Sequence, residues 1–419
     1  MADTGAAPEA AAQRKNRPVG FVDSRARTEF LRMGVATFLI FFLNAQSTML
    51  AVVLESHGMS LHDIGVLLGI FAVPVVLSTF LSGPLMARIG ALATARWGMA
   101  TMTIGFVSFA LTAASFWPAL ASRMVQGAGY GLVLAPVMTY AQGRLTQERF
   151  VYLLGVFSTM APMAQAFGPT WAEFLFLSFG DRTLFLASAI PAVGGLALTY
   201  GLRPLARPST AQGAGFGAAL RRDRVMPLVT IFVSGSMFSY LAAYMAPTLA
   251  AKGIAIGWFF TASTAAMFAA RFLGFRFVEA LDRRLVISGG LALMACGLLF
   301  VSAAGRHWAV SAGGITFGFG YSVVYPLVSA WMSEGLAPSE RSGSQALFNA
   351  VFSIGLMGMP FPVTFVIAAA GYGAAMQALA ALGLIMAAAL TASRFLASRA
   401  FEEKSQHKGE SEGLGSRPK

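Results

Sequence analysis

Residues 123–131 read Arg123-Met-Val-Gln126-Gly127-Ala-Gly129-Tyr130-Gly131 and lie inside a long apolar run. Part of this pattern returns as Gly318-Phe-Gly320-Tyr321, at an offset of 191 residues. The pair Glu148-Arg149 returns as Glu340-Arg341 at an offset of 192. Because separate landmarks recur at nearly one offset, the sequence predicts a duplicated unit whose two copies run in the same direction.

The composition indicates a membrane protein with many spans. The chain has 419 residues, of which 56% are hydrophobic and 11% charged, whereas soluble proteins carry about 25% charged residues. A single cysteine, Cys296, excludes an intrachain disulfide, and four scattered histidines predict no metal site. The net charge of +12 comes from short basic clusters between apolar runs. That placement is typical of membrane-protein loops and argues against nucleic-acid binding.

Twelve apolar runs are long enough to cross a bilayer, which takes about 20 residues. They are residues 33–55, 64–82, 98–114, 118–140, 151–173, 183–202, 227–248, 255–275, 285–304, 310–331, 346–370 and 372–393. The predicted fold class is therefore all-α and polytopic. We expect an N-terminal tail (1–29), a first six-helix bundle (30–202), a linker (203–225), a second six-helix bundle (226–396) and a C-terminal tail (397–419). The tail from Glu402 is rich in charged residues and is expected to be disordered.

Basic residues predict the orientation. With a cytoplasmic N-terminus, the inner segments hold 25 Lys and Arg and the outer loops hold 3, namely Arg182, Lys252 and Arg306. Cytoplasmic loops are enriched in Lys and Arg. Both termini are therefore expected in the cytoplasm.

The fourth span resembles a motif of the major facilitator superfamily, an Arg followed by Gln-Gly and spaced glycines. Here it consists of Arg123, Gln126, Gly127, Gly129 and Gly131. The resemblance covers nearly all of residues 30–396. It implies two parallel six-helix repeats, small-residue helix contacts, and a central pathway between the halves.

The fifth span is similar to the antiporter motif of the same family, through Gly168-Pro169. Ala164, Ala172 and Glu173 stand where the family has glycine. Pro169 should kink this helix because it donates no backbone hydrogen bond. In the family this motif marks exporters that exchange substrate for protons.

A loop after the second span resembles the charged gate loop of the family. It keeps Arg88 but has Ala87 at the acidic position. The second-half copy keeps Glu279, Arg283 and Arg284. The resemblance implies a cytoplasmic latch that lies mainly in the second half.

By the same resemblance, spans one, four, seven and ten line the pathway. Their polar residues are the candidate substrate contacts: Asn44, Gln46, Tyr130, Tyr240, Tyr244, Tyr321 and Tyr325. The candidate coupling and gating residues are Arg123, Gln126, Glu173, Arg88, Glu279, Arg283 and Arg284. For several of these residues a purely structural role stays open as an alternative. The tyrosines could pack between helices, Asn44 and Gln46 could form interhelical hydrogen bonds, Arg123 could reach the outer surface, and Glu173 could be a surface charge near Arg182.

The leading functional hypothesis is a transporter in a bacterial inner membrane that exports a small organic molecule in exchange for protons. It needs no cofactor and is expected to act as a monomer in the lipid bilayer. A proton-coupled or facilitative uptake permease is the first alternative. A non-transporting assembly or sensor protein is an alternative of another class. The 21 methionines suggest copper transport only weakly, because no His or Cys accompanies them. No nucleotide loop or catalytic constellation predicts an enzyme.

Overall fold

The computed structural model describes residues 19–205, 224–270, 282–336 and 338–414. The first half consists of α2 (Ser24–Ala45), η1 (Gln46–Met49), α3 (Leu50–Ser56), α4 (Leu61–Gly69), α5 (Ala72–Ile89), α6 (Ala91–Val107), α7 (Phe109–Thr112), α8 (Phe116–Gly131), α9 (Leu134–Gln142), η2 (Gln147–Arg149), α10 (Phe150–Ser158), α11 (Met160–Phe179), α12 (Asp181–Ala187) and α13 (Ala189–Thr199). Joined across their short breaks, these helices form six antiparallel passes.

The second half repeats this arrangement. It consists of α15 (Val225–Ala243), α16 (Met245–Ala250), α17 (Gly257–Ala269), α19 (Arg283–Ala303), α20 (His307–Ser333), α21 (Pro338–Ser353), the π-helical turn η6 (Ile354–Gly358) and α22 (Pro360–Leu414). Gly371 has a φ of 84°, which interrupts the helical backbone of α22. The interruption divides α22 into the end of the eleventh pass and the twelfth pass. The fold is therefore two parallel six-helix repeats.

Seven segments among the described residues are long and apolar enough to cross a membrane as single units. This number is smaller than twelve because several passes are broken. Ser108 separates α6 from α7, and a turn at Leu132 and Val133 separates α8 from α9. The segment Leu347–Arg394 counts once although Gly371 divides it.

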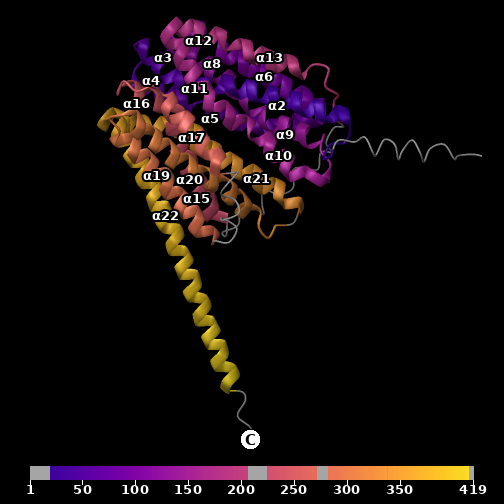
Figure 1. Ribbon diagram of the computed structural model, residues 1–419, viewed down its shortest axis with the longest axis vertical. Coiled ribbons are helices and arrows are strands. Elements are labelled where there is room, and N and C mark those ends of the chain that lie inside the picture. Colours follow the sequence, from indigo (N-terminus) through magenta and orange to yellow (C-terminus); the bar gives the residue numbers. More distant parts are fainter. Residues whose placement is uncertain (1–18, 206–223, 271–281, 337, 415–419) are drawn as a thin grey trace, which may run out of the picture.

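The passes define two faces of the bundle. The linker face carries Arg203 and Arg224, and the distal face carries Arg182, Lys252 and Arg306. Figure 1 shows α3, α4 and α16 together at one end, while α9, α10 and α21 lie toward the other end. Within the described residues, contacts between the halves concentrate at the distal ends. There α4 meets α22, α11 meets α17, η1 meets both α15 and α16, and α3 meets α16. The two halves are therefore closed against each other on the distal face.

A close approach of α4 to α22 forms part of this closure. A Cβ atom at Gly65 would lie 2.0 Å from Oγ1 of Thr364 and 2.6 Å from its Cβ. At Gly69, a Cβ atom would lie 2.7 Å from Cβ of Phe361. The two glycines, one turn apart, allow the helices to pack almost backbone to backbone.

The C-terminal end corrects one expectation. Helix α22 continues to Leu414 and projects away from the two bundles (Figure 1), although the sequence predicted disorder from Glu402. Glu and Lys are good helix formers, so a charged composition does not by itself prevent a helix from continuing.

Candidate functional site

Arg123 lies inside the first half, at one end of a chain of polar side chains that runs between helices. Its side chain is 6% exposed, so it does not extend to the distal surface. Nη1 of Arg123 donates to Oε1 of Gln126 at 2.6 Å, one turn along α8. Nε2 of Gln126 donates to Oγ of Ser47 at 2.9 Å, in the short 3₁₀ turn that interrupts the first pass. The motif therefore connects the fourth pass to the first through side chains.

Two aromatic rings complete this site. The guanidinium of Arg123 lies 3.9 Å from the ring centroid of Phe71, a cation–π contact. The centroid of Tyr130 lies 5.7 Å from that of Phe71 and 5.5 Å from that of Phe41. Phe71 and Tyr130 also pack against Met357 of η6, which belongs to the second half. The site around Arg123 thus lies next to the contact between halves. We call Arg123, Gln126, Ser47, Phe71 and Tyr130 the arginine site.

The glycines of the fourth pass allow this packing. A Cβ atom at Gly127 would lie 2.7 Å from Cγ of Pro74, and one at Gly131 would lie 2.4 Å from the Val75 carbonyl oxygen, both in α5. A Cβ atom at Gly129 would lie 2.2 Å from the backbone nitrogen of Met102 in α6. Gly127 and Gly131 therefore allow α8 to approach α5 closely, and Gly129 allows its close approach to α6.

In the fifth pass, Gly168 performs a similar role against the first pass. A Cβ atom there would lie 2.5 Å from Cβ of Ala45. Helix α11 continues through Pro169, and the break in this pass lies earlier, at Thr159.

In the second half, Tyr321 and Tyr325 of α20 are half-buried in an aromatic cluster. The centroid of Tyr321 lies 4.7 Å from that of Phe238, and that of Tyr325 lies 5.1 Å from that of Phe352. The hydroxyl of Tyr325 donates to Oδ1 of Asn349 at 2.9 Å. These residues occupy the same passes of the repeat as Tyr130, the fourth of each half.

Tyr240 and Tyr244 lie at a different place from the other tyrosines. Their exposed fractions are 0% and 1%. The Tyr240 hydroxyl lies 2.7 Å from Oγ1 of Thr248 and donates to the Tyr372 carbonyl at 3.0 Å. The Tyr244 hydroxyl donates to the Pro360 carbonyl at 2.9 Å. In this conformation both side chains connect helices of the second half.

The polar residues of the first pass also have neighbours within the bundle. Gln46 accepts a hydrogen bond from Oγ of Ser188 in the sixth pass, and its Nε2 donates to the Phe42 carbonyl at 3.3 Å. Asn44 is half-buried, and its Oδ1 has no hydrogen-bond partner among the described residues. Gln46 therefore connects two helices of one half.

Glu173 connects the two halves on the distal face. Its carboxylate oxygens accept from the backbone nitrogen of Ile256 at 3.1 and 3.2 Å. Ile256 immediately precedes α17, so the carboxylate lies at the N-terminus of that helix. Helix N-termini carry partial positive charge and free N–H groups, which favour an anion there. We call this contact the Glu173 latch.

The predicted gate loop lies on the linker face. Arg88 is exposed at the end of α5, and Glu279 lies outside the described residues. Arg283 forms an ion pair with Glu334, and its guanidinium and that of Arg284 each lie 5.6 Å from the ring centroid of Trp331. Both arginines thus contact the end of α20 within the second half. None of the ion pairs between described residues joins this loop to the first half.

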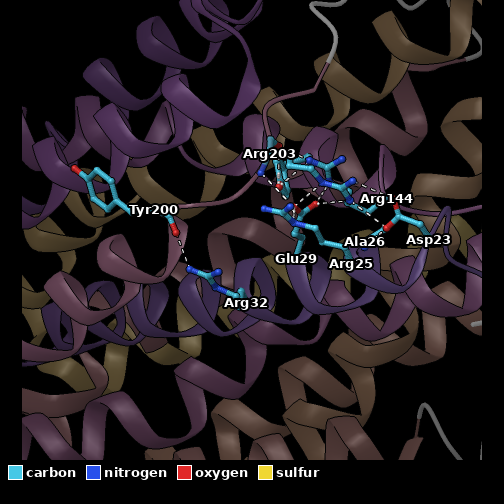
Figure 2. Close-up of polar contacts among 9 residues, drawn as sticks. Asp23, Arg25, Ala26, Glu29, Arg32, Arg144, Tyr200 and Arg203 are labelled. Carbon is cyan, nitrogen blue, oxygen red and sulfur yellow. Dashed lines mark hydrogen bonds and ion pairs between the residues drawn. The ribbon is translucent and has the colours of Figure 1, made fainter.

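A charged cluster on the linker face was not predicted from sequence (Figure 2). Glu29 is 2% exposed and lies 3.0 Å from Nε of Arg144 and 2.9 Å from Nε of Arg203. Asp23 lies 3.1 Å from Nη1 of Arg203. The hydrogen bond from Arg203 lowers the pKa of Asp23, and that from the Ala26 amide adds to the effect. In the sequence, the signal for this cluster is Glu29, a single acid among the apolar residues of α2.

The second half has a counterpart to this cluster. Arg224, at the start of its first pass, donates to the Trp331 carbonyl at 2.7 Å and to the Met332 carbonyl at 3.2 Å, near the end of α20. Each half thus joins its first and fourth passes through a buried arginine on the linker face. No group of three or more His, Cys, Asp or Glu in the described part of the chain could hold a metal ion.

The sequence matches the Major Facilitator Superfamily over residues 33–255 and again over residues 228–418. The chain therefore belongs to this superfamily. Membership identifies a multi-pass membrane protein and supports secondary transport of small molecules. The paired match agrees with the duplication seen in the structure.

Several solved structures share the fold. The human organic anion transporter MFSD10 is 16% identical, with a TM-score of 0.63, and the alignment covers 87% of this chain and 99% of that one. The nucleoside transporter NupG is 12% identical, with a TM-score of 0.68 and coverage of 87% and 98%. A bacterial homologue of the human lysosomal transporter Spinster, solved in an inward-facing conformation, is 16% identical, with a TM-score of 0.69 and coverage of 91% and 98%. No curated protein matches the chain at a significant level.

Proposed function

We propose that this transporter exports a small organic molecule from the bacterial cytoplasm in exchange for protons. The observation that carries the proposal is the Glu173 latch, a carboxylate that holds the two halves together on the distal face. We assign this face to the outside because it carries few basic residues. Under this assignment both termini lie in the cytoplasm, and the conformation described here is closed to the outside. We further propose that the chain works as a monomer in the inner membrane.

The exchange follows from the chemistry of this contact. An ionised Glu173 accepts hydrogen bonds from the start of α17 and stabilises the closed distal face. A proton arriving from outside removes the negative charge, and the attraction to the helix N-terminus weakens. Proton binding would then favour opening outward, where substrate leaves. For exchange, the bound proton is carried inward and released to the cytoplasmic side, and the ionised carboxylate then stabilises the closed distal face again. The titratable group thus acts on the equilibrium between the two states.

The arginine site and the aromatic cluster of Tyr321 and Tyr325 lie in corresponding passes of the two halves. We propose that they face the substrate between the halves, with Arg123 and Gln126 adjusting as the halves rock. The solved relatives carry nucleosides in one case and organic anions in another, so the shared fold does not select a substrate class.

Reconstituted vesicles test the proposal. Proteoliposomes containing a pH-sensitive dye are exposed to fractions of a bacterial metabolite extract. For exchange, uptake of a substrate moves protons out and makes the lumen more alkaline, and Glu173→Gln abolishes this response. Acidification of the lumen instead indicates proton-coupled uptake. If no fraction changes the lumenal pH or accumulates in the vesicles, the protein is a non-transporting member of the family.

A further inference from the structure

The arginine site contains a buried cation that has no carboxylate partner among the described residues. Arg123 is 94% shielded from solvent, with an exposed fraction of 6%. None of the ion pairs between described residues involves it. Its Nε is buried and has no hydrogen-bond partner within the described part of the chain. A charged arginine inside a membrane protein is costly and normally has a counter-charge or a functional role.

The contacts that Arg123 does make are with neutral groups, and they fix its orientation. Gln126 accepts from Nη1 at 2.6 Å, and its own amide is oriented by the hydrogen bond to Ser47 at 2.9 Å. Phe71 lies under the guanidinium plane at 3.9 Å. A guanidinium has five donor hydrogens, so these contacts leave donors for another acceptor. Two parallel hydrogen bonds from one edge of a guanidinium suit a carboxylate.

The neighbouring surface suits a flat apolar group. Arg123 and Tyr130 are seven residues apart on α8, which places them two turns apart on one face. Both contact Phe71, the guanidinium at 3.9 Å and the Tyr130 ring at 5.7 Å between centroids. An anion near Arg123 could therefore carry a ring that packs against Tyr130.

We propose that the arginine site binds the carboxylate of an aromatic or similarly flat organic acid, and that such acids are the substrate class of this transporter. This inference rests on the proposed transport function and specifies its cargo. The bound carboxylate supplies the counter-charge that no residue in the described ranges provides at Arg123. Substrate and proton then act at different places, the arginine site and the Glu173 latch.

The test measures the charge preference of the site without knowing the natural substrate. Tyr130→Cys is introduced in a Cys296→Ala background, so that it is the single thiol. Its rates of modification by an anionic and a cationic methanethiosulfonate reagent are compared in inside-out vesicles. We expect Arg123→Gln to lower the ratio of anionic to cationic rate about tenfold, since a local charge concentrates ions of opposite sign. Arg182→Gln, at an exposed arginine in the first turn of α12, is the matched control and should leave the ratio unchanged.

Protection by paired compounds completes the experiment. Benzoate and benzamide share a ring and differ in charge, and benzoate should slow modification of Tyr130→Cys much more than benzamide does. Arg123→Lys keeps the positive charge but loses the two parallel hydrogen bonds of the guanidinium. It should therefore keep the ratio of anionic to cationic rate and weaken the protection by benzoate. Because Arg123→Lys retains the charge, a native rate ratio in this variant shows that the effect of Arg123→Gln comes from lost charge and not from misfolding.

Each outcome has a distinct meaning. A ratio that does not depend on Arg123, or equal or absent protection by benzoate, overturns the anion inference while leaving transport intact. Failure of both reagents to reach Tyr130→Cys overturns the proposed pathway itself. A ratio that depends on Arg123, together with selective protection by benzoate, supports the inference.

Discussion

Replacing Glu173 with glutamine should shift this transporter toward the state that is open on the distal face. The side chain keeps its shape and one carbonyl oxygen, so it can still accept from Ile256, where the native distances are 3.1 and 3.2 Å. It loses the negative charge at the N-terminus of α17. A hydrogen bond to a charged group contributes about 1 kcal/mol more than a neutral one, and the helix dipole contributes about 0.3–1 kcal/mol.

The sum is about 1–2 kcal/mol, which changes the ratio of closed to open states about five- to thirtyfold. Spin labels at Ser56→Cys and Ala251→Cys can report this ratio, because both positions are exposed and flank the distal contact of α3 with α16. Double electron–electron resonance in a Cys296→Ala background should show a larger population at long distance in Glu173→Gln. Glu55→Gln, which neutralises an exposed acid at the end of α3, is the control and should change little.

Mild acid provides a second arm of the same experiment. Protonation removes the same charge as the substitution, so lowering the pH should lengthen the distances in the native protein and leave Glu173→Gln unchanged. The reasoning is refuted if Glu173→Gln has the native distance distribution, or if Glu55→Gln shifts it equally. A response to pH that persists in Glu173→Gln would assign proton sensing to another group.

Three further predictions concern stability. Glu29→Ala should lower the free energy of unfolding by about 3–5 kcal/mol, because it leaves the buried Arg144 without its carboxylate. Glu148→Ala, at an exposed site, should have little effect, and thermal unfolding in detergent measures both. Gly131→Ala should lower the melting temperature, because its Cβ would lie 2.4 Å from a backbone oxygen of α5, and a melting temperature equal to the native one would show that α5 can move aside. The hydrogen bond from Arg203 lowers the pKa of Asp23, so its stabilising effect is present above the ordinary carboxyl pKa and is lost as the pH falls through the lowered value. Asp23→Asn should therefore lower the free energy of unfolding at neutral pH and reduce its fall as the pH is lowered. A pH dependence of unfolding equal to that of the native protein would contradict the assignment.

Much of the fold is predictable from local pattern. Continuous apolar runs predict membrane helices, because a bilayer requires every backbone polar group to be bonded within the segment. The glycine-rich stretch beginning at Gly127 predicts close helix packing, and its partial copy at Gly318 predicts duplication. The predicted superfamily was confirmed by the match over both halves.

The positions of polar side chains depended on packing that the sequence pattern does not reveal. Four tyrosines in paired positions had the same appearance in sequence, yet Tyr240 and Tyr244 are buried between helices while Tyr321 and Tyr325 are half-buried in an aromatic cluster. Their roles as substrate contacts stay predictions. Helical periodicity places residues on a face but does not tell which neighbour covers that face.

The sequence by itself determined the twelve passes, their duplication and the distribution of basic residues, because these depend on composition and period along the chain. Only the tertiary structure decided that Glu173 meets the start of α17, that Glu29 joins Arg144 and Arg203, and that Arg123 lies beside Phe71. These contacts join residues far apart in sequence. Their geometry depends on how passes of the two bundles pack and tilt, which is a property of the assembled helices and not of any single segment.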